Sequence, residues 1–277
     1  MESDAIIYEK QAGIATLTKN NAPQYGMTLD VLTAMKRALV DANNDEDIQV
    51  IVITAGGPGF HMGGVVLGEA KTDWEFTPVE FKEALLTGLN VFRLIETIEK
   101  PVIGVAKAGA VGGGFENLHA CDFVIAGEDA RFSQPEVTLG MICGWGGTQR
   151  LPRLVGWRKA KELLMEGIEV SGIEAAELGL VTRAVPTDQV DQEVAALCER
   201  LKKNGPVAMG YTKLAMNKVW ETDIRNGIDF ELEASAVVNG AGEFTAAVFE
   251  DFLAGRQPNF KKRRRITADD KWRGIVD

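Results

Sequence analysis

Runs of almost uninterrupted apolar residues restrict this chain most strongly to one class of fold. Val50–Thr54 and Val102–Ala106 contain hardly any polar side chains and are rich in Val and Ile, which is typical of strands buried on both faces of a sheet. Such a sheet needs helices on both sides. Leu29–Ala42 spaces its apolar residues along one helical face, and Val79–Thr97 is also helical in pattern. The sequence therefore predicts an α/β fold.

The pattern changes near Pro186. Before it, strand-like runs alternate with helical ones, and the remaining strand-like runs are Ile6–Tyr8, Ile14–Thr18, Phe123–Ala126 and Val181–Val185. After it only helical patterns occur, at Val190–Lys203, Ala208–Glu221, Ile224–Asn239 and Thr245–Ala254. We therefore expect an α/β core over residues 1–195 and a helical C-terminal segment over residues 196–277.

Composition excludes several classes of function. No apolar run is long enough to span a bilayer, and the acidic start Met1–Asp4 resembles neither a signal nor a transit peptide, so the cytoplasm is the expected location. The net charge of −10 argues against general binding to nucleic acid or anionic lipid. Three cysteines without metal-ligand spacing and only two histidines argue against a metal site. The basic run Lys261–Arg265 is expected to be a solvated tail or a contact for a phosphorylated ligand or an acidic neighbouring subunit.

Two glutamates stand in segments that can poise a carboxylate. Glu116 follows the glycine run Gly112–Gly114, and Glu136 closes the segment Phe132–Glu136. Glycine leaves backbone N–H groups open to close approach by a ligand, and a pair of carboxylates can serve as general acid and base. Function is therefore expected at this pair.

Spacing alone leaves both glutamates open to a structural explanation. Phe115, Leu118 and Cys121 form the apolar stripe of the helix after the glycine run, which places Glu116 off that stripe as a solvated first-turn acid favoured by the helix dipole. Glu136 similarly fits an ordinary loop acid. The glycine run also lacks the G-x-G opening of the dinucleotide fingerprint, so a dinucleotide site is not predicted.

The segments around both glutamates match a known pattern. They are Gly112–Glu116, Ala120–Asp122, Arg131–Glu136, Gly146–Leu151, Ala175–Val181 and Phe252–Pro258. Together they resemble the crotonase superfamily and, within it, the enoyl-CoA hydratases. The resemblance covers nearly the whole chain and outweighs the structural explanation of the two glutamates.

The resemblance implies an acyl-CoA thioester substrate and an oxyanion hole built from two backbone N–H groups, which fall on Gly64 and Gly113. Fixed donors of this kind stabilise a developing oxyanion by a few kcal/mol each. Two glutamates hold one water in such hydratases, and these fall on Glu116 and Glu136. Glu116 would activate the water that attacks Cβ, and Glu136 would exchange the proton at Cα.

The same resemblance implies substrate-binding positions at Met62, Gly144 and Trp145. Trp145 replaces a small residue and is expected either to pack in the core or to shape the acyl pocket for a cyclic or aromatic group. Cys143 replaces a usual proline.

Two further departures from the family lie near the N-terminal half of the site. Val65 replaces an expected Asp in the loop that carries Gly64, and the His61 side chain is expected to be partly exposed in that loop. Pro23–Gly26 lacks an expected basic contact to CoA, which gives Lys261–Arg265 a larger expected role in binding its phosphates.

The resemblance also implies the architecture and assembly. We expect a spiral of strand–strand–helix turns, with a C-terminal helical segment that builds a homotrimer or a dimer of trimers and completes the CoA site. No metal or redox cofactor is implied, because CoA is part of the substrate. The expected function is hydration of an enoyl-CoA, or the reverse dehydration, in fatty acid metabolism. The alternatives are a double-bond isomerase or an acyl-CoA hydrolase of the same family, and a non-catalytic or RNA-binding relative.

Overall fold

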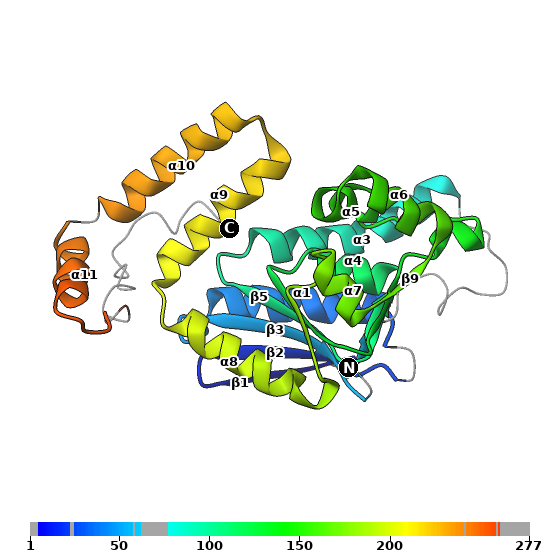
Figure 1. Cartoon of the computed structure of the whole chain (residues 1–277), viewed down its shortest axis with the longest axis horizontal. Coiled ribbons are helices and arrows are strands. Elements are labelled where there is room, and N and C mark those ends of the chain that lie inside the picture. The colour runs from blue at the N-terminus through cyan, green and yellow to red at the C-terminus, as the bar shows by residue number, and fades with distance from the viewer. Residues whose placement is uncertain are drawn as a thin grey trace. The chain divides into compact units, whose positions relative to one another are not determined.

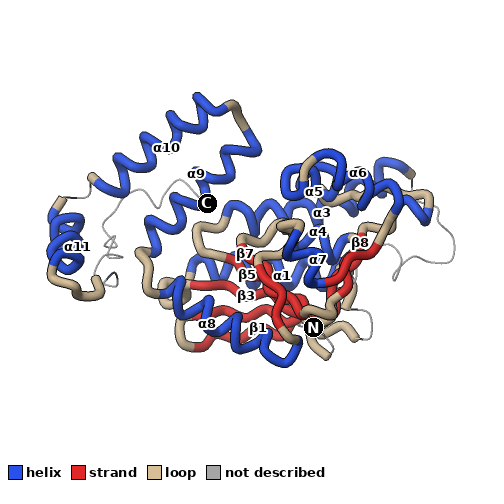
Figure 2. Tube along the Cα trace, viewed as in Figure 1, coloured by secondary structure: helices blue, strands red, loops and turns tan. Residues whose placement is uncertain are grey.

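The strands within the described residues form two sheets. The computed structural model describes residues 5–22, 25–57, 59–61, 77–240, 242–258 and 260. The larger sheet has the strand order β1-β2-β3-β5-β7-β10 and the smaller one the order β4-β6-β8-β9, and the strands are drawn in red in Figure 2. Their bounds are β1 Ile6–Gln11, β2 Ile14–Lys19, β3 Val50–Ala55, β4 Phe60–His61, β5 Val102–Ala106, β6 Gly109–Val111, β7 Phe123–Gly127, β8 Arg131–Ser133, β9 Glu169–Ser171 and β10 Arg183–Val185.

The chain adds strands to the two sheets alternately. β3, β5 and β7 are consecutive parallel strands of the larger sheet, and each is followed by a strand of the smaller sheet, β4, β6 and β8. A helix follows each pair before the chain returns to the larger sheet. Each strand–strand–helix turn therefore moves one strand further along both sheets, which confirms the predicted α/β spiral.

Helices cover the larger sheet as the buried strands require. α1 (Leu29–Asn44) and α3 (Pro78–Thr97) pack against each other and enclose a core with β2 and β3, and Figure 1 shows both helices beside the strands. The strand β3 is buried almost throughout and β5 entirely, as their uninterrupted apolar sequences predicted. Thr28 caps the N-terminus of α1, and its hydroxyl accepts a hydrogen bond from the N–H of Val31.

A second core lies between the smaller sheet and the helices that follow it. These helices are α4 (Gly113–His119), α5 (Gly147–Val155), α6 (Trp157–Glu166) and α7 (Gly172–Glu177). Phe115 of α4 packs on Phe132 of β8 with ring centroids 5.0 Å apart, and Leu151 of α5 and Leu163 of α6 complete the same cluster. The segment between β8 and α5 includes the 3₁₀ turn η1 (Glu136–Leu139), and its Trp145 belongs to the first core.

The chain divides into two compact units, residues 1–201 and 202–277. The boundary expected at 195/196 lies inside α8 (Val190–Lys202), near whose end the units divide. The second unit contains α9 (Pro206–Glu221), α10 (Ile224–Asn239) and α11 (Glu243–Leu253), so the predicted change to helices is confirmed. In the part of the chain that the structure describes, no helix is long and apolar enough to cross a membrane.

Candidate active site

Glu116 lies in the interior of the first unit. It belongs to α4, all of whose residues are buried, and its side chain is only 2% exposed. Its oxygen Oε1 accepts two backbone hydrogen bonds, from the N–H of Trp145 at 2.9 Å and from the N–H of Gly147 at 2.7 Å. The interpretation of Glu116 as a solvated acid is therefore wrong, because α4 is enclosed on every side rather than along one stripe.

The two donors to Glu116 depend on an abrupt turn at Gly146. This residue has a φ of +108°, and a Cβ added there would lie 2.2 Å from Nη1 of Arg150, so glycine is required at this position. The turn begins α5 and directs two N–H groups at one carboxylate oxygen. A side chain at Gly147 would also crowd this oxygen, because its Cβ would lie 3.2 Å from Oε1.

Burial dominates the electrostatics of Glu116. Removal from water raises the pKa of this carboxyl to about 7, against the opposing effect of the two backbone N–H donors. The nearby charges of Glu136 and Arg150 act in opposite directions, with Glu136 raising the pKa and Arg150 lowering it. Glu116 can therefore change protonation state near neutral pH.

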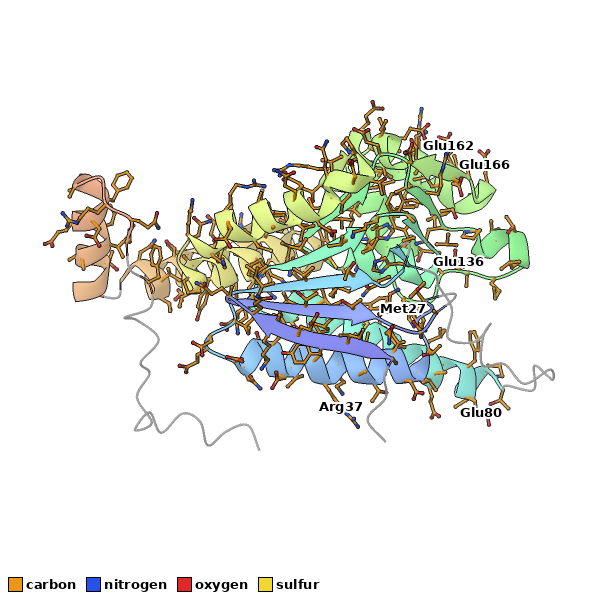
Figure 3. The ribbon with its side chains drawn as sticks, turned by 90° about the horizontal axis from the view of Figure 1, so that it is seen from below. Met27, Arg37, Glu80, Glu136, Glu162 and Glu166 are labelled. Atoms are coloured by element: carbon orange, nitrogen blue, oxygen red, sulfur yellow. The ribbon has the colours of Figure 1, made fainter. Side chains whose placement is uncertain are left out.

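Glu136 begins the turn η1 and is half-buried. The turn packs against α6. Figure 3 labels Glu136 and, on α6, Glu162 and Glu166. Burial raises the pKa of Glu136, and its own backbone N–H and then the nearby Cys143 thiol oppose that effect. The structure thus brings two carboxyl groups with raised pKa values close enough for one charge to affect the other, which is the condition for an acid–base pair.

Arg150 supports this site, although sequence reasoning gave it no role. Its guanidinium is buried and donates to the carbonyl oxygen of Trp145 and to Oε1 of Glu96, both at 2.6 Å. It thereby fixes the Trp145–Gly146 peptide, which lies between the two N–H groups that bind Glu116. The sequence did contain an indication of this role, because Arg150 lies in the segment Gly146–Leu151 that matches the family pattern.

The indole of Trp145 lies in the core of the first unit. It is 3% exposed, packs edge-on against Phe92 of α3 with centroids 5.4 Å apart, and donates from Nε1 to the carbonyl oxygen of Leu85 at 2.9 Å. Gly88 of α3 lies directly against the ring, where an added Cβ would be 2.5 Å from an indole carbon. This placement agrees with the core-packing alternative, and a contact between Trp145 and the acyl group stays a prediction.

The other predicted positions are distributed differently. Gly113 is buried at the first turn of α4, where helical geometry leaves the N–H without a partner inside the helix. Gly144 lies against the Leu85 side chain, to which an added Cβ would approach within 2.9 Å. Met62 and Gly64 lie outside the described residues, as does the basic run Lys261–Arg265.

His61 is fully buried, so its expected partial exposure is wrong. Its Nε2 lies 2.6 Å from the carbonyl oxygen of Val105, and because a carbonyl only accepts, Nε2 carries the proton in this contact. This bond joins β4 to the larger sheet at β5. Burial and the neighbouring Lys19 ammonium lower the pKa of His61 well below its ordinary value. The neutral ring therefore anchors β4 to the larger sheet.

An apolar cavity adjoins Glu136. Its volume is about 340 Å³. Its walls come from η1, the segment before α5, and helices α5 and α6, and they include Val137, Met141, Ile142, Leu164 and Met165. An apolar group attached to a molecule held at the two glutamates can be accommodated there.

Comparison with known proteins agrees with this geometry. The family model described as enoyl-CoA hydratase/isomerase matches residues 9–263. The crotonyl-CoA hydratase of Syntrophomonas wolfei is 36% identical over 261 residues, which cover 94% of this chain and 99% of that protein. The short-chain-enoyl-CoA hydratase of Clostridium acetobutylicum is 34% identical over 235 residues, covering 84% and 89%.

Similarity extends to solved structures. The crystal structure of an enoyl-CoA hydratase from Bacillus anthracis superimposes with a TM-score of 0.86 at 29% identity, covering 93% of this chain and 99% of that one. The arrangement of the two sheets and their helices is therefore shared with that enzyme.

Proposed function

Because the chain belongs to the enoyl-CoA hydratase/isomerase family, as its matched segments predicted, we propose that it adds water across the α,β double bond of an enoyl-CoA thioester, or removes it in the reverse direction. One observation supports this activity above the others. Two carboxyl groups with raised pKa values interact at one site, and the deeper one is held by two backbone N–H donors.

In the proposed hydration, Glu116 takes a proton from the water whose oxygen bonds to Cβ. The electron pair of the double bond moves toward the thioester carbonyl, and Cα receives a proton from Glu136. One carboxyl must be ionised and the other protonated, which the interaction between their charges favours near neutral pH. Gly113 and Gly64 are the proposed N–H donors to the thioester oxygen in this intermediate state.

The acyl group in this proposal is apolar, which the cavity beside Glu136 supports. A ring-bearing acyl group was expected from a pocket-lining Trp145, and the position of the indole in the core gives that expectation no support. The reaction needs no metal or redox cofactor in this mechanism, because water and two carboxyl groups supply every transferred atom.

We further propose that the C-terminal unit mediates self-association into a trimer or a dimer of trimers and completes the CoA site. Its helices carry many large apolar side chains with high exposure in the single chain, among them Ile224 at 82% and Leu253 at 81%. Apolar side chains gathered on exposed helices are typical of protein interfaces. Sedimentation of the purified protein tests this, and a monomer at micromolar concentration would contradict it.

Product analysis by mass spectrometry tests the activity. With crotonyl-CoA, hydration yields a thioester heavier by one water. Isomerisation of a suitable enoyl-CoA would leave the mass unchanged, and hydrolysis would release free CoA, so these two family alternatives give different products. Absence of the hydrated product over short, long and cyclic enoyl-CoAs would contradict the proposal.

A further inference from the structure

The two glutamates are held by different kinds of group. Backbone N–H groups of other residues fix Glu116, whereas the carboxylate of Glu136 is approached by its own backbone N–H and by the side chains of Gln134 and Cys143. A carboxylate on a short 3₁₀ turn at the edge of a cavity has few packing constraints of its own. Its orientation therefore depends on the groups that bind it.

Gln134 provides the first of these groups. Its side chain is 1% exposed and directly follows β8. With its amide nitrogen rather than its amide oxygen facing Glu136, Gln134 can donate hydrogen bonds to the carboxylate. This nitrogen then lies 3.0 Å from Oε1 and 3.1 Å from Oε2 of Glu136. A buried amide with both carboxylate oxygens in reach fixes the plane of the carboxylate as well as its position.

Cys143 provides the second group. Its Sγ lies 3.5 Å from the side-chain amide of Gln134, the group that approaches the Glu136 carboxylate, and the nearby thiol lowers the pKa of Glu136. The same sulfur is near Glu116, because both border the space in front of Gly147. A Cβ added to Gly147 would lie 3.1 Å from Sγ of Cys143 and 3.2 Å from Oε1 of Glu116. The thiol therefore lies near both carboxyl groups.

The surroundings of Cys143 keep its thiol protonated, so that it can act only as a hydrogen-bond donor. Burial first, and then the charges of Glu116 and Glu136, raise the pKa of the thiol far above its ordinary value. The thiolate is the reactive nucleophile, and an enoyl thioester is an electrophile at Cβ. Keeping the proton on sulfur thus leaves an S–H donor that does not compete with water for the substrate.

We propose that Gln134 and Cys143 are positioning residues that jointly orient the Glu136 carboxylate and set the pH at which it loses its proton. This inference rests on the proposed hydration for its kinetic consequences. Donors to a carboxylate stabilise its ionised form, so removing either donor shifts Glu136 toward its protonated form. The alkaline limb of the hydration rate, where Glu136 loses its proton, then moves to higher pH.

The kinetic test uses Gln134→Leu and Cys143→Ala, which remove the donors with little change in size. Each is expected to lower kcat about 10-fold with little change in KM and to move the alkaline limb upward. Cys143→Ser keeps an O–H donor and is expected to restore most of the rate. Cys198→Ala, a thiol substitution in α8, is the matched control and should leave the pH profile unchanged.

A double-mutant cycle separates orientation of Glu136 from a general structural effect. In the Glu136→Gln background, adding Gln134→Leu or Cys143→Ala should lower the residual rate by less than about 2-fold, because the group they act on is absent. A full 10-fold loss in that background would overturn the proposal. Wild-type pH profiles for both single variants would also overturn it.

A measurement without turnover distinguishes this inference from the proposed function. The rate at which iodoacetamide alkylates Cys143, followed by peptide mass mapping, should rise about 10-fold in Glu136→Gln, since one pKa unit changes the thiolate fraction by that factor. Alkylation of Cys198 provides the internal reference. An unchanged rate at Cys143 would contradict the Cys143–Glu136 contact, whatever the enzyme does with enoyl-CoA.

Discussion

Oε1 of Glu116 lies 2.7 Å from the backbone nitrogen of Gly147, and this hydrogen bond joins α4 to the first turn of α5. The contact fixes one carboxylate oxygen in the interior, so the other oxygen is the one available to a reacting molecule. It also places an ionisable group where burial, rather than charge, sets its protonation.

The pH profile of hydration should be bell-shaped, with an acid limb far above the range of an ordinary glutamate. Protonation of Glu116, whose pKa is raised to about 7 by burial, removes the base, so kcat/KM should fall as the pH decreases through that value. The Glu136 charge raises this pKa further, so Glu136→Gln should move the acid limb of the residual rate to lower pH. An acid limb near 4.5 in the wild type would contradict the assignment.

Glu116→Gln should increase the free energy of unfolding of the protein, and this increase should depend on pH. The folded state holds the Glu116 proton up to about pH 7, whereas the unfolded chain releases it near the ordinary value of 4.5. Wild-type stability therefore decreases relative to the variant by about 1.4 kcal/mol per pH unit between these values and levels off above them.

Thermal unfolding from pH 4 to 8 measures this difference. Glu166→Gln, at an exposed position on α6, is the control and should show no comparable growth of the difference with pH. A difference between Glu116→Gln and wild type that is constant over this range would contradict the buried, protonated state of Glu116.

Gly88→Ala should disturb the support of Trp145. The new Cβ would lie 2.5–2.8 Å from three indole atoms, and overpacking of a buried ring typically costs about 1–3 kcal/mol. Since the N–H of Trp145 binds Glu116, hydration should slow as well. Gly227→Ala in α10, where the nearest side-chain atom is 4.0 Å from the added Cβ, should instead stabilise by about 1 kcal/mol. Equal stability of wild type and Gly88→Ala by urea unfolding would contradict this packing.

Much of the fold was predictable because its signals are local. The apolar strands Val50–Thr54 and Val102–Ala106 and the helical face of Leu29–Ala42 each predicted an element that the structure contains. The short strands of the smaller sheet were not predicted individually. Segments such as Gly109–Val111 have only three residues, so pairing with distant strands rather than their own periodicity defines them.

The site was less accessible to spacing arguments. Glu116 and His61 were both expected to contact solvent, and both are buried, because burial of a short element depends on what tertiary packing places around it. The pairing of Glu116 with Gly147 joins residues from separate helices, which no local pattern contains. The matched segments predicted roles for both glutamates, whereas the roles proposed for Gln134 and Cys143 and the contacts of Arg150 depend on tertiary structure.

The most direct test of the acid–base pair is the turnover of Glu116→Gln and Glu136→Gln with crotonyl-CoA and larger enoyl-CoAs. Each substitution keeps the size of the side chain and removes the transferable proton. Both variants should therefore fold and lose about 10²–10⁴-fold in kcat. Near-wild-type turnover by either variant on a good substrate would contradict the role assigned to that glutamate.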